Sequence, residues 1–269
     1  MTTVSPTETV PYGPDTLHLE VSGPETGPPV LLLHGWGSRA SLMHPLAEAL
    51  ADRYRVYNPD LPGHGHSPPP PEPWGVPEHA GLVRDLIERN IGAPVTLIGH
   101  SNGGRIGLYM ASDPALAPLV QRLVLISPSG ITPRRTMAYH VRRMLARALK
   151  APFAWLPPPL SDPALDWLRH SLVWKALGSS DYRALEGVMR GTFVKTVNCH
   201  LDDRVHRITV PTLIFWGDRD EAVSLEQMKR LEERIPDAGL VVLEGAGHYG
   251  HLDDPDTVIA ATRYFLEHT

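Results

Sequence analysis

The sequence predicts an α/β protein built on a mostly parallel central sheet with helices on both faces. First, short apolar runs bounded by glycine and proline alternate with longer segments of helical period. Second, residues 30–33 and 123–126 are apolar throughout, which is typical of strands buried on both faces. Third, a chain of 269 residues, 42% of them hydrophobic, can bury most of its apolar surface around one core.

The expected elements follow in order along the chain. Strands are expected where apolar runs are short and flanked by turn residues, and Pro94 and Pro211 mark two strand entries. Helices are expected between the strands, and Pro255 stands in the first turn of the last helix, where a missing N–H costs nothing. The expected strands are 17–21, 30–34, 54–58, 95–99, 123–127, 212–216 and 240–243. The expected helices lie near 41–51, 78–90, 102–112, 224–235 and 255–267.

The alternation of strands and helices stops between about 132 and 207. This stretch has helical periodicity, a run of prolines at 157–159 and no convincing strand. An insertion of roughly 70 residues is too long for a bare connection inside a compact domain. We therefore expect a core formed by residues 1–131 and 208–269. Residues 132–207 are expected to form a helical cap, or lid, over the carboxyl edge of the sheet.

Composition excludes several classes of function. A formal net charge of −5 provides no general positive field, so nucleic-acid binding is not expected. Cys199 is the only cysteine, which excludes an internal disulfide and a cysteine-based metal cluster. The amino terminus lacks the pattern of a secretory signal, and no apolar run approaches the roughly 20 residues that cross a bilayer. We expect a cytoplasmic protein without stable membrane insertion.

The strongest chemical signal is the pentapeptide Gly99-His100-Ser101-Asn102-Gly103. It follows an expected strand and precedes an expected helix, and G-x-S-x-G in that context forces the serine into a sharp turn with its hydroxyl exposed above the sheet. A side chain at either glycine would collide with the neighbouring strand and helix. The pentapeptide alone would fit an ordinary glycine-rich turn, so the strand–turn–helix context carries the prediction.

Four blocks in order make the chain resemble the α/β-hydrolase family from about residue 15 to the end, apart from the cap. The blocks are HGWG at 34–37, DLPGHGHS at 60–67, the serine turn at 99–103, and the late pair GDRD at 217–220 and GH at 247–248. The resemblance implies a serine hydrolase on a mostly parallel sheet. Dehalogenases and epoxide hydrolases of this fold use an aspartate at the turn, so Ser101 argues against both.

The resemblance also implies catalytic residues. A serine hydroxyl needs an adjacent base that is itself oriented by an acid, and the family's chain order is serine, acid, histidine. These roles correspond to Ser101, Asp220 and His248. Asp218 is the alternative acid, but the family motif places the acid three residues after the glycine. Asp218 is therefore expected to be a turn residue.

The backbone N–H groups of Trp36 and Asn102 are implied, by the same resemblance, as the oxyanion hole. His64 and His66 form an H-x-H pattern that resembles part of a metal site. Such sites need further ligands at defined spacing, and the family accounts for this loop as a turn, so no metal is expected. The sequence contains no G-x-G-x-x-G or P-loop motif, and no cofactor is expected.

The cap carries two further hypotheses. Residues 134–150 contain six basic and no acidic residues, with apolar residues at helical spacing, which predicts a basic amphipathic cap helix. Its basic face is expected to be solvated, and an anionic acyl carrier or a lipid surface is the sharper hypothesis. An apolar acyl pocket is also expected, lined by some of Met144, Phe153, Trp155, Leu156, Trp167, Trp174, Met189 and Phe193.

These observations predict a carboxylesterase that cleaves esters of small to medium acyl chains through an acyl-enzyme intermediate. Two alternatives keep the same Ser–Asp–His set: a carbon–carbon bond hydrolase acting on ring-cleavage diketones, and an acyltransferase or perhydrolase. A non-catalytic ligand receptor on the same fold is the alternative from another class. Substrate identity lies beyond the sequence, because one fold serves many chemistries.

Overall fold

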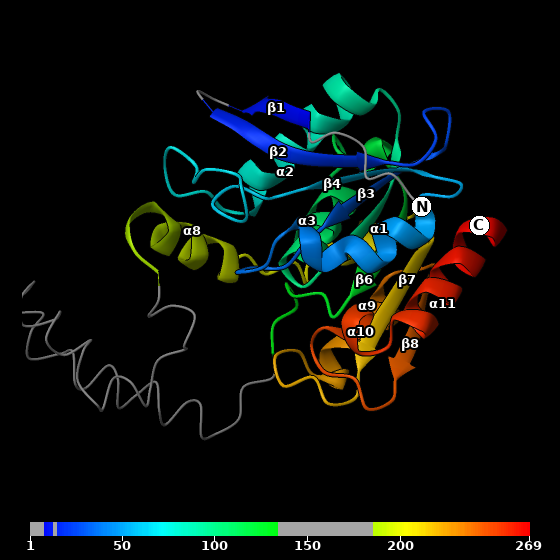
Figure 1. The fold of residues 1–269 in the computed structure, drawn as a ribbon. Coiled ribbons are helices and arrows are strands. Elements are labelled where there is room, and N and C mark those ends of the chain that lie inside the picture. The colour runs from blue at the N-terminus through cyan, green and yellow to red at the C-terminus, as the bar shows by residue number, and fades with distance from the viewer. Residues whose placement is uncertain (1–7, 13–14, 134–184) are drawn as a thin grey trace, which may run out of the picture. The chain divides into compact units, whose positions relative to one another are not determined.

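A computed structural model describes residues 8–12, 15–133 and 185–269 (Figure 1). Its described strands form one eight-stranded sheet in the order β1-β2-β4-β3-β5-β6-β7-β8. β2 is antiparallel to both of its neighbours, and all other neighbouring strands are parallel. The predicted mostly parallel sheet is confirmed. The strands are β1 Glu8–Tyr12, β2 Asp15–Ser22, β3 Pro29–Leu33, β4 Arg55–Pro59, β5 Val95–His100, β6 Val120–Ile126, β7 Thr212–Gly217 and β8 Ala238–Leu243.

All seven expected strands are present, and one strand was missed. β1 lies in a segment that is polar and interrupted by prolines, and it contains Pro11. An edge strand tolerates proline because one side of its backbone needs no sheet partner. The apolar pattern of a central strand is also absent from this segment. β6 ends one residue earlier than expected, since Ser127 has φ 44° and leaves the extended conformation.

The expected helices are also present, with refined ends. Residues 41–51 divide into η1 and α1, residues 78–90 divide into α2 and the π-turn η2, and α11 begins at Pro255 as predicted. No helix in the described parts of the chain is long and apolar enough to span a bilayer. The helices and turns are η1 Ala40–Met43, α1 His44–Leu50, α2 Val76–Leu86, η2 Ile87–Ile91, α3 Asn102–Ser112, η3 Ala117–Leu119, α8 Gly187–Val197, η5 Val205–Arg207, α9 Leu225–Arg234, α10 Gly250–Asp253 and α11 Pro255–His268.

Helices cover both faces of the sheet, and alternate residues of the central strands point to each face (Figure 1). Leu31 and Leu33 of β3 belong to a buried cluster with α2, α3 and α9, whereas Val30 and Leu32 belong to a second cluster with α1 and α11. β5 and β6 divide their apolar residues in the same way. This double burial is the physical reason that these strands are apolar throughout.

The chain divides into two compact units, residues 1–132 with 188–269 and residues 133–187. The second unit is narrower than the cap expected at 132–207, because most of α8 and all of η5 belong to the unit of the sheet. The basic segment at 134–150 lies outside the described residues. The helical cap therefore stays a prediction.

Candidate active site

The turn between β5 and α3 holds Ser101 in an unusual backbone conformation, with φ 49° and ψ −105°. A non-glycine residue in such a conformation costs on the order of 1–3 kcal/mol, and it persists only where its surroundings impose it. The Ser101 N–H donates to the carbonyl of Ile126 at 2.9 Å. The Ser101 carbonyl accepts from the N–H groups of Arg105 at 3.0 Å and Ser129 at 3.1 Å. These bonds hold the serine in place from two segments of chain, the first turn of α3 and the end of β6 with the turn after it.

Two glycines make this turn possible, as the sequence predicted. A Cβ atom at Gly103 would lie 2.0 Å from the carbonyl oxygen of Leu33 in the neighbouring strand. A Cβ atom at Gly99 would lie 2.5 Å from the backbone of Gly103. Both distances are far below contact distance, so the expected collisions are confirmed. The helix can approach the sheet, and lift the serine above it, only with glycine at both positions.

Three loops at the carboxyl ends of β5, β7 and β8 bring Ser101, Asp220 and His248 together. The Nδ1–H of His248 donates to Asp220 Oδ2 at 2.8 Å. Nε2 of the same ring therefore accepts from the Ser101 hydroxyl, whose Oγ lies 3.0 Å away. The Asp220 side chain is fully buried, and that of His248 is 22% exposed. The three side chains form one continuous hydrogen-bonded series from a buried carboxylate to a hydroxyl at the surface of the sheet.

The two candidate acids differ in their surroundings. Burial raises the pKa of Asp220, but hydrogen bonds from the His248 ring and the Val223 N–H lower it by more, so the net pKa is below the usual value. The group consequently stays ionised. Asp218 is exposed, and its Oδ1 accepts from the Gly245 N–H at 2.8 Å. Asp218 thus makes the kind of contact expected of a turn residue.

The expected oxyanion donors lie on two segments next to Ser101. A Cβ atom at Gly35 would lie 3.2 Å from the Ser101 Cβ, so the loop that contains Trp36 lies directly against the serine. Asn102 is the first residue of α3, where N–H groups have no acceptor within the helix and the helix dipole favours negative charge. Within the described part of the chain, neither backbone N–H donates a hydrogen bond.

His34 joins the loop at 34–37 to the loop at 60–67. Its Nδ1–H donates to the Gly35 carbonyl at 2.8 Å, and its Nε2 accepts from the Leu61 N–H at 2.9 Å. Burial, assisted by the neighbouring His64, lowers the pKa of His34 to about 4, so the ring stays neutral and keeps an acceptor nitrogen. The sequence marked His34 only as part of a motif and missed this role.

Two further buried histidines surround His248, and sequence reasoning missed both. The Nε2–H of His100 donates to the backbone carbonyl of His248 at 2.9 Å. Its ring centroid lies 4.9 Å from that of His251. Burial is the main cause that places the pKa of His100 well below its usual value and lowers the pKa of His251 to about 4. His100 could have been noticed as the residue before the serine, whereas nothing in the sequence signals His251.

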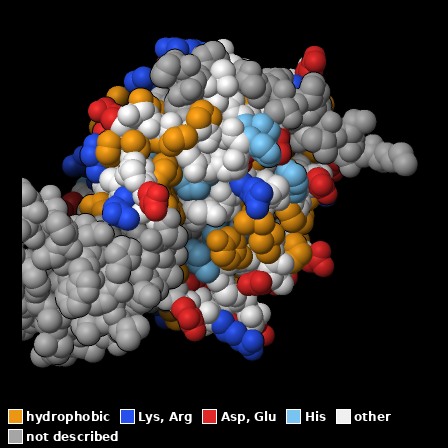
Figure 2. Space-filling view, turned by 60° about the vertical axis from the view of Figure 1, so that its left-hand side comes forward, with side chains coloured by type: hydrophobic (Ala, Val, Ile, Leu, Met, Phe, Trp, Pro, Cys, Tyr) orange, Lys and Arg blue, Asp and Glu red, His pale blue; other side chains and the backbone are white. Residues whose placement is uncertain are grey.

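Apolar side chains lie beside the two loops. The Trp36 ring centroid is 5.2 Å from that of Phe193 and 5.0 Å from that of His64, edge to face in both cases. Met189 lies directly over Gly63. Figure 2 shows apolar and histidine side chains next to each other on one face of the molecule. The other residues named for the acyl pocket are outside the described ranges, namely Met144, Phe153, Trp155, Leu156, Trp167 and Trp174.

The H-x-H pair does not act as a unit. Nδ1 of His64 donates to the Pro62 carbonyl at 3.0 Å, while Nδ1 of His66 lies 3.3 Å from Asp60 Oδ2. Within the described residues, the side chains that could share a metal ion are His18, Asp60 and His66. His18 lies in β2, and Asp60 and His66 lie in the loop after β4, so this group includes none of the residues that are hydrogen-bonded in series to Ser101.

Comparisons with known proteins identify the fold family. The family model described as alpha/beta hydrolase fold matches residues 28–255. An uncharacterised protein of Mycobacterium tuberculosis is 29% identical over 266 residues, covering 91% of this chain and 76% of that protein. A pimeloyl-[acyl-carrier protein] methyl ester esterase of Aeromonas hydrophila is 29% identical over 259 residues, covering 89% and 96%. The structure of an enol-lactonase from Burkholderia xenovorans superposes with a TM-score of 0.73 at 22% identity, covering 97% and 100%, which is a likeness of fold.

Proposed function

This chain belongs to the alpha/beta hydrolase fold family, and on that premise we propose that it is a serine hydrolase that cleaves carboxylic esters of small to medium acyl chains. The observation that carries the proposal is the hydrogen-bonded series from Asp220 through His248 to Ser101 at a strained turn. Relatives named as esterases support the reaction class.

In the proposed reaction, the Ser101 Oγ attacks the ester carbonyl carbon while its proton passes to Nε2 of His248. The ionised Asp220 stabilises the resulting imidazolium through the Nδ1–H bond. Collapse of the tetrahedral intermediate expels the alcohol, which takes the proton from His248. A water molecule, deprotonated by the same ring, then attacks the acyl-enzyme and releases the acid and Ser101.

The negative oxygen of the intermediate would be bound by the backbone N–H groups of Trp36 and Asn102. One such donor is worth roughly 2.7–4 kcal/mol of transition-state stabilisation. Support comes from the contact of the 34–37 loop with Ser101 and from the position of Asn102 at the start of α3.

The direct test is hydrolysis of p-nitrophenyl esters of graded acyl length by the wild-type protein and by the Ser101→Ala variant. We expect turnover that is highest for short to medium chains and that falls at least about 10⁴-fold in the variant. A fluorophosphonate probe should label the wild-type protein and not the variant. Activity that survives the substitution would contradict the mechanism. Failure of the wild-type protein to react with the probe would favour a ligand receptor.

The acyl group of the natural substrate is proposed to be presented by an anionic acyl carrier. Two observations favour this substrate over a free ester. Several relatives are named as esterases of an acyl-carrier-protein ester. Residues 134–150, in the expected cap at 132–207, contain six basic and no acidic residues. Opposite charges of carrier and cap would accelerate association and orient the carrier.

The carrier hypothesis is tested by the double variant Arg142→Ala and Arg143→Ala. It should lose on the order of tenfold or more in kcat/KM on a carrier-bound methyl ester while retaining its rate on p-nitrophenyl butyrate. Arg89→Ala removes an exposed arginine elsewhere and should change neither rate. Equal losses on the two substrates would refute carrier recognition.

The expected cap and the cytoplasmic location rest on the sequence and belong to the same proposal.

A further inference from the structure

Three side chains meet where β2 lies beside the carboxyl end of β4. His18 belongs to β2, and Asp60 and His66 belong to the loop after β4. Nδ1 of His18 lies 3.1 Å from Asp60 Oδ2, and Nδ1 of His66 lies 3.3 Å from the same oxygen. One potential ligand atom from each residue lies within 4.8 Å of the others. Two imidazoles thus converge on one carboxylate.

The backbone holds this group in position. The Asp60 N–H donates to the His18 carbonyl at 3.0 Å, and the His18 N–H donates to the Ser67 hydroxyl oxygen at 2.9 Å. Asp60 Oδ1 accepts from the Ala40 N–H at 2.7 Å, and Oδ2 accepts from the His66 N–H at 2.8 Å. These bonds keep the carboxylate ionised and aimed at the two rings before any ligand arrives.

Gly65 shapes the loop around the carboxylate. It has φ 54°, and a Cβ atom at this position would lie 2.1 Å from Asp60 Oδ2. The chain can therefore curl closely enough to bring the His66 ring to the carboxylate only with glycine here. The three ligand positions depend on this local geometry and on the pairing of two strands that are distant in sequence.

The two histidine–carboxylate distances, 3.1 and 3.3 Å, fit a shared metal ion. Nitrogen and oxygen ligands about 2.0–2.1 Å from one tetrahedral Zn²⁺ lie about 3.3 Å from each other. Nδ1 of His18 is buried and makes no hydrogen bond, although it lies close to Asp60 Oδ2. Nδ1 of His66, in contrast, hydrogen-bonds to Asp60 Oδ2, and a bound ion would take the place of that proton.

The site also has access to solvent. Asp60 is 1% exposed and His18 is 16% exposed, whereas His66 is 76% exposed. The His66 ring can therefore rotate toward the other two ligands, and water can fill the remaining coordination positions. Two histidines with one carboxylate form a set that suits Zn²⁺ and its neighbours in the first transition series.

We propose that His18, Asp60 and His66 bind a divalent transition metal ion of the Zn²⁺ class. The ion would join β2 to the 60–67 loop and stabilise the folded chain, since the unfolded chain lacks the assembled ligands. This role is independent of the hydrolase mechanism. The alternative for the same side chains is a pair of imidazolium–carboxylate ion pairs that bind no metal.

The experiment titrates the full-length, tag-free, EDTA-treated protein with ZnCl₂ near neutral pH, by isothermal calorimetry and by thermal unfolding. We expect one equivalent of Zn²⁺ to bind and the melting temperature to rise with Zn²⁺ concentration. His66→Gln and His18→Gln should each weaken binding at least about tenfold, because each removes one of three protein ligands. His206→Gln removes an exposed histidine elsewhere and should bind as the wild type does.

Several outcomes would overturn the proposal. Absence of Zn²⁺ binding to the wild-type protein would leave the ion-pair alternative. Wild-type affinity in His66→Gln would mean that the metal binds elsewhere, as would an equal loss in His206→Gln. The exposed position of His66 makes misfolding of that variant a minor concern, so its result decides the matter if His18→Gln fails to fold. A Co²⁺ titration adds a spectroscopic test, because a bound ion produces visible absorption that the His66→Gln variant should lack.

Discussion

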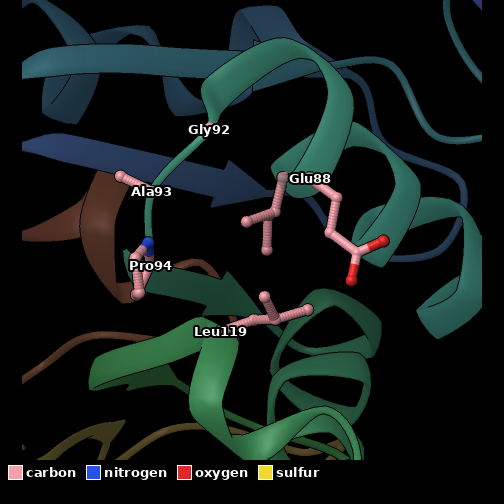
Figure 3. Close-up of a pocket in the computed structure, with 6 residues that line it drawn as sticks. Glu88, Gly92, Ala93, Pro94 and Leu119 are labelled. Atoms are coloured by element: carbon pink, nitrogen blue, oxygen red, sulfur yellow. The ribbon is translucent and has the colours of Figure 1, made fainter.

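The two ends of β5 differ in shape and in chemistry. At the amino end, a surface pocket of about 240 Å³ is lined by Ile87, Glu88, Gly92, Ala93, Pro94 and Leu119 (Figure 3). Its charged side chain, Glu88, lies 3.9 Å from Arg84 on its own helical segment. At the carboxyl end, Ser101 occupies a strained turn and joins a buried carboxylate through His248.

A pocket alone therefore does not identify a functional site. The carboxyl ends of parallel strands face the amino termini of the following helices, so free N–H groups and diverging loops gather there. Strain, neutral buried histidines and oriented hydrogen bonds are found at that end. The residues that line the pocket at the amino end include no histidine and no non-glycine residue with positive φ.

Replacement of the acid, Asp220, should have the largest effect on catalysis at the carboxyl end of β5. Asp220→Asn keeps the size of the side chain but removes the charge that stabilises an imidazolium, so kcat on p-nitrophenyl esters should fall by roughly 10⁴-fold. Asp218→Asn is the matched control, because the side chain of this exposed residue accepts from a turn N–H, and its rate should stay within a few-fold of wild type. Comparable losses in the two variants would refute the assignment of Asp220 as the acid.

Two glycine substitutions, one at each end of β5, should differ in how much they lower the free energy of unfolding. Gly103→Ala forces a Cβ atom to within 2.0 Å of the Leu33 carbonyl oxygen and should lower the free energy of unfolding by about 3 kcal/mol or more. Gly92→Ala, at the amino end, meets nothing within 4 Å and has only the strain of φ 75°, so about 1 kcal/mol is expected. Urea unfolding measures both values, and equal losses would contradict the packing argument.

The buried histidines make the carboxyl end sensitive to acid. The pKa of His251 falls from 6.5 in the unfolded chain to about 4 in the folded one, so the folded state binds fewer protons between these values. Its contribution is fully present above pH 6.5 and is lost as the pH falls toward 4, by roughly 3 kcal/mol. The ring is surrounded by His100, His248 and Asp253.

Urea unfolding at a series of pH values tests this sensitivity. In His251→Gln, the free energy of unfolding should fall by roughly 3 kcal/mol less between pH 6.5 and 4 than in the wild type, because glutamine binds no proton in either state. His206→Gln removes an exposed histidine and should keep the wild-type slope. An unchanged slope in His251→Gln would show that this buried ring titrates alike in both states.

The smallest effect is expected in the amino-end pocket. Glu88→Gln removes the charge from its wall, and the ion pair with Arg84 is an exposed one of little energetic value. Esterase activity should stay within about twofold, and the free energy of unfolding within about 0.5 kcal/mol. A large loss of activity in this variant would mean that the pocket takes part in function and that the contrast between the two ends is wrong.

Much of the fold was predictable because its signals are local. The apolar runs of β3 and β6 reflect burial on both faces, and Pro255 and Gly99 act through their own backbone geometry. β1 was missed because an edge strand has a weak apolar pattern. The chain forms a compact unit at 133–187, and most of α8 belongs to the unit of the sheet, while the helical cap at 132–207 stays a prediction.

The central strands and the glycine-flanked serine turn follow from local sequence patterns, and the three residues of the series at Ser101 follow from the resemblance to a known family. The neutral state of His34, His100 and His251, the bond from His100 to the backbone of His248, and the approach of His66 to His18 and Asp60 instead of His64 depend on the folded chain. The cause is distance along the chain. Propensity and periodicity act over a few neighbouring residues, whereas desolvation and converging ligands depend on segments far apart in the sequence, such as His100 and His248, which are separated by 148 residues.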